Sequence, residues 1–291
     1  MKRPYGTVFL ALLPLAVLAM GKEPVPSGHA LLARCVEASG GGEAYRQRRS
    51  VSYRFQEKSS HEGLRVVVDG RQYFKRPTGE DLWGREETTS PLGRTLTVFG
   101  PGGAGVWDNA VAVKDPGLRD WAQAHLRENA FWFFLPHHVM ESGSRVEEDG
   151  TGPFPGESKL CRKLRVRLSA SAWGGDIEEL SLYLDTATPT LEGAVFRRAG
   201  EDYRLRYLYR KDFFFPEWEI RDAEGRKILS FLAYDLDVST GGADDLFDPS
   251  RAPSGGFFRR DELPTEGDEE DPDCKCKRGG LFDLRRVRSP E

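Results

Sequence analysis

The sequence predicts an α+β fold that is mostly β: one large, curved antiparallel sheet with a few helices covering it. Long segments alternate apolar and polar residues with a period of two, which is typical of antiparallel strands that have one buried and one solvated face. Helical spacing of apolar residues is clear in only two segments, near residue 30 and after residue 115. Many strands and few helices together define the class.

Two helices are predicted from their caps and their apolar spacing. The first follows Ser27, a good N-cap residue, and ends at the glycines 40–42. The second begins at Asp115-Pro116, because these residue types favour the N-cap and the first helical position. Its apolar stripe runs from Leu118 into the aromatic run 131–134, and the helix is predicted to stop at Pro136.

Five segments show the strand alternation most clearly: 51–55, 160–168, 180–184, 203–209 and 228–238. In three of these segments the alternation assigns one set of residues to the buried face. The sets are Leu160, Leu164, Val166 and Leu168; Tyr203, Leu205, Tyr207 and Tyr209; and Ile228, Leu232, Tyr234, Leu236 and Val238. Cys161 falls on the opposite, solvated side. Turns are expected at Asp69-Gly70, 186–190 and 223–226.

Composition excludes two broad classes of function. The 291 residues include 42 basic and 46 acidic side chains, for a net charge of −4, so there is no basic footprint for nucleic acid. With 38% apolar and 30% charged residues, the chain is not a multi-spanning membrane protein.

The ends of the chain differ from its centre, and three segments are expected. Residues 1–21 read as a secretory signal peptide, because Lys2 and Arg3 precede an uncharged apolar run too short to span a bilayer. The folded domain is predicted over 22–250. Residues 251–291 are rich in Pro, Gly and acidic residues and then in basic ones, a pattern that predicts a charged, disordered tail. The protein is therefore expected to be exported, with no transmembrane segment in the mature chain.

Export bears on the four cysteines, Cys35, Cys161, Cys274 and Cys276. All four are disulfide candidates outside the cytoplasm, and they allow three complete pairings, which the sequence leaves open. A bridge between Cys274 and Cys276 would close a very short, strained ring. Metal binding or redox exchange by this Cys-x-Cys pair is the weaker alternative, because no other zinc ligands lie at a standard spacing.

A search for catalytic and cofactor motifs does not identify an enzyme. Residues 100–105 match the glycine pattern of dinucleotide-binding loops, but a strand-like segment follows, so they are predicted to form a hairpin turn. His137-His138 is the only histidine pair and is assigned a structural or surface role rather than a metal site. No nucleophile elbow or HExxH motif is present. We expect no catalytic residues, no metal and no cofactor.

The unusual feature of this polar chain is its 11% aromatic content. The aromatic residues concentrate in a few segments and suggest either a well-packed core or an apolar pocket between sheet and helix. The candidates for lining such a pocket are Trp107, Trp121, Phe131, Trp132, Phe134, Tyr207, Phe214 and Trp218.

The order of several short motifs resembles a known family. They are Gly40-Gly-Gly-Glu-Ala-Tyr45, Gly105-Val-Trp-Asp108, Phe131-Trp-Phe-Phe-Leu-Pro136, Leu180-Ser-Leu-Tyr-Leu-Asp185, Phe215-Pro-Glu-Trp-Glu-Ile220 and Leu246-Phe-Asp-Pro249. This order is similar to that of the outer-membrane lipoprotein-sorting-like proteins, relatives of the periplasmic lipoprotein carrier of the Lol type. The resemblance implies an open half-barrel whose concave face is covered by helices and holds acyl chains. It also implies a location in the periplasm or cell envelope of a bacterium.

The leading hypothesis is therefore an envelope protein that binds or carries a lipid, a lipoprotein acyl chain or another apolar ligand in the concave face. An alternative is an envelope interaction or assembly protein with a filled core, for which the tail 251–291 would contact a protein partner. A secreted hydrolase with a spatially assembled site is the third hypothesis.

Overall fold

The computed structural model describes residues 27–61, 64–77, 81–90, 93–169, 172–173, 175–238 and 244–250. The predicted signal peptide and tail, with Cys274 and Cys276, lie outside these residues.

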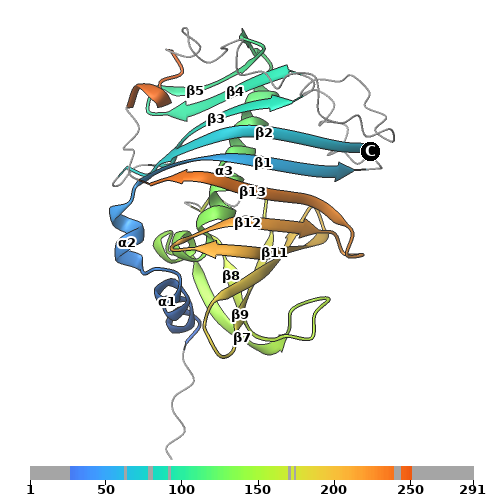
Figure 1. The fold of residues 1–291 in the computed structure, drawn as a ribbon. Helices are drawn as coiled ribbons and strands as arrows, with labels where there is room; N and C mark the ends of the chain where they lie inside the picture. Colours follow the sequence, from blue (N-terminus) through green and yellow to red (C-terminus); the bar gives the residue numbers. More distant parts are fainter. Residues whose placement is uncertain are drawn as a thin grey trace, which may run out of the picture.

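A single antiparallel sheet dominates the described part of the chain (Figure 1). Its thirteen strands follow the spatial order β6-β5-β4-β3-β2-β1-β13-β12-β11-β10-β9-β8-β7, and the sheet is not closed. Their bounds are β1 Ser50–His61, β2 Leu64–Lys75, β3 Trp83–Ser90, β4 Gly93–Gly100, β5 Gly103–Asp108, β6 Val111–Ala112, β7 Arg145–Pro153, β8 Leu160–Arg167, β9 Glu179–Asp185, β10 Leu191–Arg198, β11 Glu201–Lys211, β12 Phe214–Arg221 and β13 Lys227–Asp237. The predicted fold class, a mostly β half-barrel with few helices, is confirmed.

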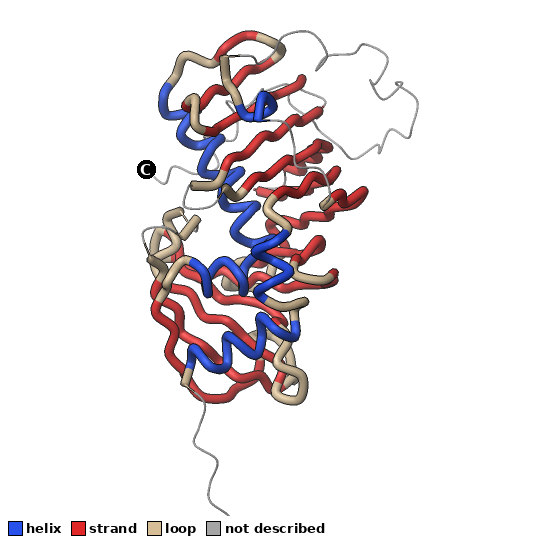
Figure 2. Tube along the Cα trace, turned by 90° about the vertical axis from the view of Figure 1, so that its left-hand side faces the viewer, coloured by secondary structure: helices blue, strands red, loops and turns tan. Residues whose placement is uncertain are grey.

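Helices cover one face of this sheet, and the longest of them runs along it. α3 (Pro116–Glu141) passes from the β3–β5 end to β12, while α1 (Gly28–Ala38) packs against both α3 and β7 (Figures 1 and 2). The short α2 (Gly42–Gln47), which the sequence analysis did not predict, follows α1, and the 3-10 helix η1 (Asp244–Phe247) contacts β3 and β4. Both predicted caps are confirmed: the side chains of Ser27 and Asp115 accept hydrogen bonds from the first turns of α1 and α3.

The prediction that the second helix stops at Pro136 is wrong, because α3 continues through this proline to Glu141. A proline in a helix lacks the N–H that would bond to the carbonyl four residues earlier, here that of Trp132. The hydroxyl of Tyr207 on β11 donates a hydrogen bond of 2.8 Å to the Trp132 carbonyl. The sheet therefore supplies the donor that the helix lacks.

Several residues that were predicted to be buried are exposed, because some of the strands are irregular. In β13 the core-facing residues are Phe231 and Ala233, and Leu232 and Tyr234 are exposed. Asp235 has a positive φ of 50°, and the pairing with β1 shifts register at this point. The irregularity changes the alternation, so that Leu236 packs against the core again.

β8, β11 and β2 also differ from the prediction. Leu160 is exposed and Cys161 is buried, the reverse of the expected exposures, because Cys161 packs with Phe154 and Tyr183 in a cluster separate from the main core. Tyr209 is exposed because the β11–β12 pairing shifts register just before it. Gly70 lies inside β2 rather than in a turn, and glycine is needed there because a side chain would collide with the ring of Phe55. The other predicted turns, 100–105, 186–190 and 223–226, do join consecutive strands.

Candidate functional site

Six of the eight predicted pocket residues come together between α3 and the concave face of the sheet. Phe131, Trp132 and Phe134 lie on α3, Tyr207 on β11, and Phe214 and Trp218 on β12; all six are buried. They belong to the main hydrophobic core together with three neighbouring rings that were not selected from the sequence, Phe133, Phe196 and Phe231. We call this set of nine side chains the aromatic zone.

Ring contacts fill the aromatic zone. The ring centroids of Trp218 and Phe231 are 4.0 Å apart and those of Trp132 and Phe196 4.8 Å apart. Phe133 stacks on Phe214 at 5.1 Å. In this state the rings pack against one another.

The two remaining pocket candidates lie elsewhere. Trp121 is half-buried on the N-terminal part of α3, where it stacks on His125 with the ring centroids 5.5 Å apart. Trp107 on β5 packs over Gly105, two residues away on the same strand, and the strand alternation places both on the face opposite α3.

Below the N-terminal part of α3 the concave face is polar. The Tyr53 hydroxyl donates to Gln72 at 2.6 Å, and the Gln72 amide donates to the Glu86 carboxylate. His125 of α3 lies 3.5 Å from the Glu57 carboxylate. We call these five residues the polar ladder. Because the members come from three neighbouring strands and one helix, only the folded register brings them together.

Burial controls the protonation of the polar ladder. It raises the pKa of the Glu86 carboxyl, while the positive charge of His125 and the hydrogen bond from Gln72 lower it and the Glu57 charge raises it further. Burial also raises the pKa of Tyr53, with the charge of Glu86 contributing in the same direction.

His137 and His138 have structural roles in the buried part of α3. Desolvation lowers the pKa of each to about 3, with the charge of Arg76 contributing, so both are neutral at physiological pH. His138 accepts a hydrogen bond of 3.2 Å from the Trp173 backbone, and His137 stacks on Tyr45. The assignment to a structural role is supported, although both residues lie on a helix and not on a strand.

Cys35 and Cys161 are both buried free thiols, so these two disulfide candidates do not pair with each other. Burial raises the pKa of the Cys35 thiol to about 12, which makes it a poor nucleophile and a poor metal ligand. Cys161 lies in a small separate cluster with Phe154 and Tyr183.

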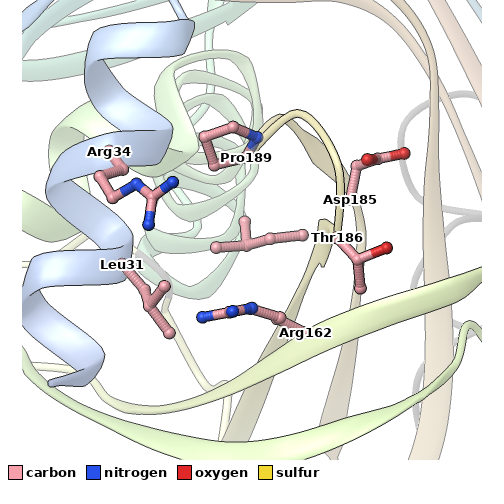
Figure 3. Close-up of a pocket in the computed structure, with 7 residues that line it drawn as sticks. Leu31, Arg34, Arg162, Asp185, Thr186 and Pro189 are labelled. Carbon is pink, nitrogen blue, oxygen red and sulfur yellow. The ribbon is translucent and has the colours of Figure 1, made fainter. Parts of the chain in front are cut away.

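A partly open pocket lies at the edge of the core, between α1 and the turn that joins β9 to β10 (Figure 3). Its walls are formed by Leu31 and Arg34 of α1, Arg162 of β8, Leu184 and Asp185 of β9, and the turn residues Thr186 and Pro189. Its empty volume is about 290 Å³, part of which is open to solvent. Neither the pocket nor its two arginines was selected from the sequence. The available signal was Arg162 itself, a charged residue in the alternation between Leu160 and Leu164.

The described ranges contain neither a cluster of metal ligands nor a membrane-spanning helix. No group of three or more His, Cys, Asp or Glu side chains there is arranged to hold a metal ion. No helix among these residues is long and apolar enough to cross a membrane.

Comparison with known proteins shows the fold. No family model and no curated protein matches the chain. Among solved structures, a DUF1329 family protein from Desulfovibrio piger matches with a TM-score of 0.52 at 10% identity, covering 77% of this chain and 96% of that one. At this identity the match shows a shared fold alone.

Two further structures match over a similar length. A putative outer-membrane lipoprotein-sorting protein domain from Vibrio parahaemolyticus matches with a TM-score of 0.45 at 13% identity, over 73% of this chain and 98% of that one. A LolA superfamily protein from Nitrosomonas europaea matches with a TM-score of 0.41 at 10% identity, over 76% and 97%. Both are described as proteins of the group that the sequence motifs of this chain resemble.

Proposed function

We propose that this chain is an exported protein of the bacterial cell envelope that binds a lipid, a lipoprotein acyl chain or another apolar ligand between α3 and the concave face of the sheet. The observation that carries the proposal is the aromatic zone, in which a helix laid on an open sheet is held by aromatic contacts. Export rests on the sequence of residues 1–21, and the absence of enzymatic activity stays a prediction.

The energy of such binding comes from apolar burial. Each acyl methylene that leaves water contributes roughly 0.8 kcal/mol, so a long chain can offset the loss of several ring contacts. The rings occupy the space in the present state, and a bound chain must therefore replace contacts between α3 and β12. Pro136 makes this region the favoured place for such a replacement, because α3 lacks one backbone hydrogen bond at the centre of the aromatic zone.

Quenching of tryptophan fluorescence by brominated fatty acids tests the proposal. Trp132 and Trp218 lie in the aromatic zone and Trp107 lies on the opposite face, so the three give a matched set. Quenching of the delipidated protein should fall in W132F and W218F and persist in W107F. Native mass spectrometry of protein from its own host should detect a bound lipid. Absence of quenching together with absence of bound lipid would contradict the proposal.

A second candidate is an envelope interaction or assembly protein whose filled core takes no ligand. The observation that favours it is the dense ring packing, with centroid separations as short as 4.0 Å. Crosslinking in the native envelope that captures a protein partner, with no quenching by brominated fatty acid, would select this candidate.

A further inference from the structure

The pocket beside α1 joins the hydrophobic core to the solvent. Leu31 and Leu184 line it, and both are also members of the main core, with exposures of 2% and 1%. The pocket thus has an apolar inner wall that continues into the interior. An apolar chain entering here would meet core side chains directly.

Two guanidinium groups stand at the same pocket. Arg162 occupies a core-facing position of β8, directly opposite Leu184 on β9 and in the alternation that buries Leu164 and Val166. Arg34 reaches the pocket from the other side, on α1 (Figure 3). A charged residue on the dry side of a strand is unusual, because burial of a charge without a partner costs free energy.

Neither guanidinium is neutralised by the rest of the described structure. Within those residues, the side chains of Arg34 and Arg162 make no hydrogen bond and no ion pair, whereas that of Arg198 pairs with Glu128 and Asp176. The acidic residue of the pocket, Asp185, is engaged elsewhere: Lys159 lies 2.8 Å from its carboxylate, and the backbone N–H groups of the following turn donate to it. Figure 3 shows its carboxylate directed away from both arginines.

We infer that this pocket binds the anionic head group of an amphiphile, a phosphate or carboxylate, through Arg34 and Arg162, with the acyl chain directed past Leu31 and Leu184 into the core. The inference rests on the proposed function and specifies its ligand class. Guanidinium groups match the geometry of phosphate and carboxylate oxygens. The pocket is small and partly open to solvent, so it suits a head group and not a whole lipid.

Three probes, each used below any micelle-forming concentration, separate the head group from the chain: dodecyl phosphate, neutral dodecyl maltoside and inorganic phosphate. The variants are R34Q and R162Q. The matched control is R167Q. Arg167 is an exposed residue of the same strand, and because it lies five positions from Arg162 it is on the opposite face of the sheet. Calorimetry measures binding, and circular dichroism confirms that each variant is folded.

The wild type should bind dodecyl phosphate more tightly than dodecyl maltoside. R162Q should weaken dodecyl phosphate binding about tenfold, since a hydrogen bond to a charged group contributes on that order, and the more exposed Arg34 should contribute less. Maltoside binding should not change in either variant, and R167Q should behave as wild type with both probes.

Three results would overturn the inference, and they are distinguishable. If both dodecyl compounds bind equally and the variants have no effect, the head-group site is wrong while the proposed function stands. If inorganic phosphate binds as tightly as dodecyl phosphate with the same dependence on arginine, the pocket takes a free anion and not an amphiphile. If neither dodecyl compound binds, the proposed function fails together with the inference.

Discussion

The two halves of α3 meet the same face of the same sheet through opposite chemistry. From Ala130 onward the helix is buried among the rings of the aromatic zone. Over 116–129 it buries a few aliphatic side chains and also meets the polar ladder, where Glu57 and Glu86 approach His125. Tyr53 joins the two regions, since its ring stacks on Phe133 at 4.6 Å and its hydroxyl donates to Gln72.

This difference indicates which half of the helix can give way to a ligand. Apolar contacts are not directional, so an acyl chain can replace a ring without leaving a group unsatisfied. The polar ladder cannot admit a chain on the same terms, because each separated donor or acceptor would stay buried without a partner. We expect the N-terminal half of α3 to anchor the helix and the C-terminal half to move.

The largest expected effect is the loss of a ring from the aromatic zone. F133A should lower the free energy of unfolding by about 3–5 kcal/mol, because Phe133 is fully buried and contacts rings on both α3 and the sheet. N129A, one turn earlier beside His125, should cost about 1 kcal/mol, the order of a single hydrogen bond. Urea denaturation measures both, and equal costs would remove the distinction between the halves.

Local signals allowed much of the fold to be predicted. The N-caps Ser27 and Asp115 act within three residues, and the alternation of 51–55 and 180–184 depends only on neighbouring positions. Part of the aromatic zone was selected for the same reason, since Phe131, Trp132 and Phe134 stand in one short run. These features need no knowledge of which strands pair.

The features that were missed depend on contacts between distant segments. The irregularity at Asp235 changes which residues of β13 face the core, and no residue type in the segment predicts it. α3 passes Pro136 because Tyr207, 75 residues from Trp132, supplies a donor. Gln72 and Glu86 form the polar ladder only once β2 and β3 are in register. Sequence periodicity carries none of this information.

Acid should destabilise the C-terminal half of α3 through His137. His137 has a pKa of about 3 in the folded protein and about 6.5 when unfolded, so the unfolded chain binds more protons between these values. Stability is therefore lost as pH falls below 6.5, by about 2 kcal/mol at pH 5 for this imidazole.

H137F should reduce the stability loss between pH 7 and pH 5 by about that 2 kcal/mol relative to wild type. Phenylalanine keeps the stacking on Tyr45, and neither imidazole nitrogen has a hydrogen-bond partner in the described structure to lose. Denaturant titrations at the two pH values measure the difference. An unchanged loss in H137F would show that this histidine is already protonated, or solvated, in the folded state.

A double-mutant cycle tests how the sheet supports α3 at its proline. Y207F should destabilise the protein by about 1–3 kcal/mol, because the buried Trp132 carbonyl loses its side-chain donor. In the P136A background the helix regains its own N–H donor, so the same Y207F change should cost much less. Additive costs in the cycle would mean that Tyr207 stabilises the core by packing alone.

The smallest expected effect lies in the polar ladder and has the opposite dependence on pH. Burial raises the pKa of Glu86 in the folded protein above its unfolded value of 4.5, so the folded state binds more protons than the unfolded chain just above that pH. The stability that Glu86 contributes is complete below pH 4.5 and decreases as pH rises through the folded pKa.

E86Q keeps an acceptor for the Gln72 amide but cannot ionise, so it should gain stability relative to wild type as pH is raised from 4.5 to 7. Denaturant titrations over this range, with E217Q as the control from a half-exposed glutamate of β12, measure the gain. If E86Q instead loses stability as pH rises, the ionised carboxylate stabilises the polar ladder, and the N-terminal half of α3 is anchored by charge rather than by neutral hydrogen bonds.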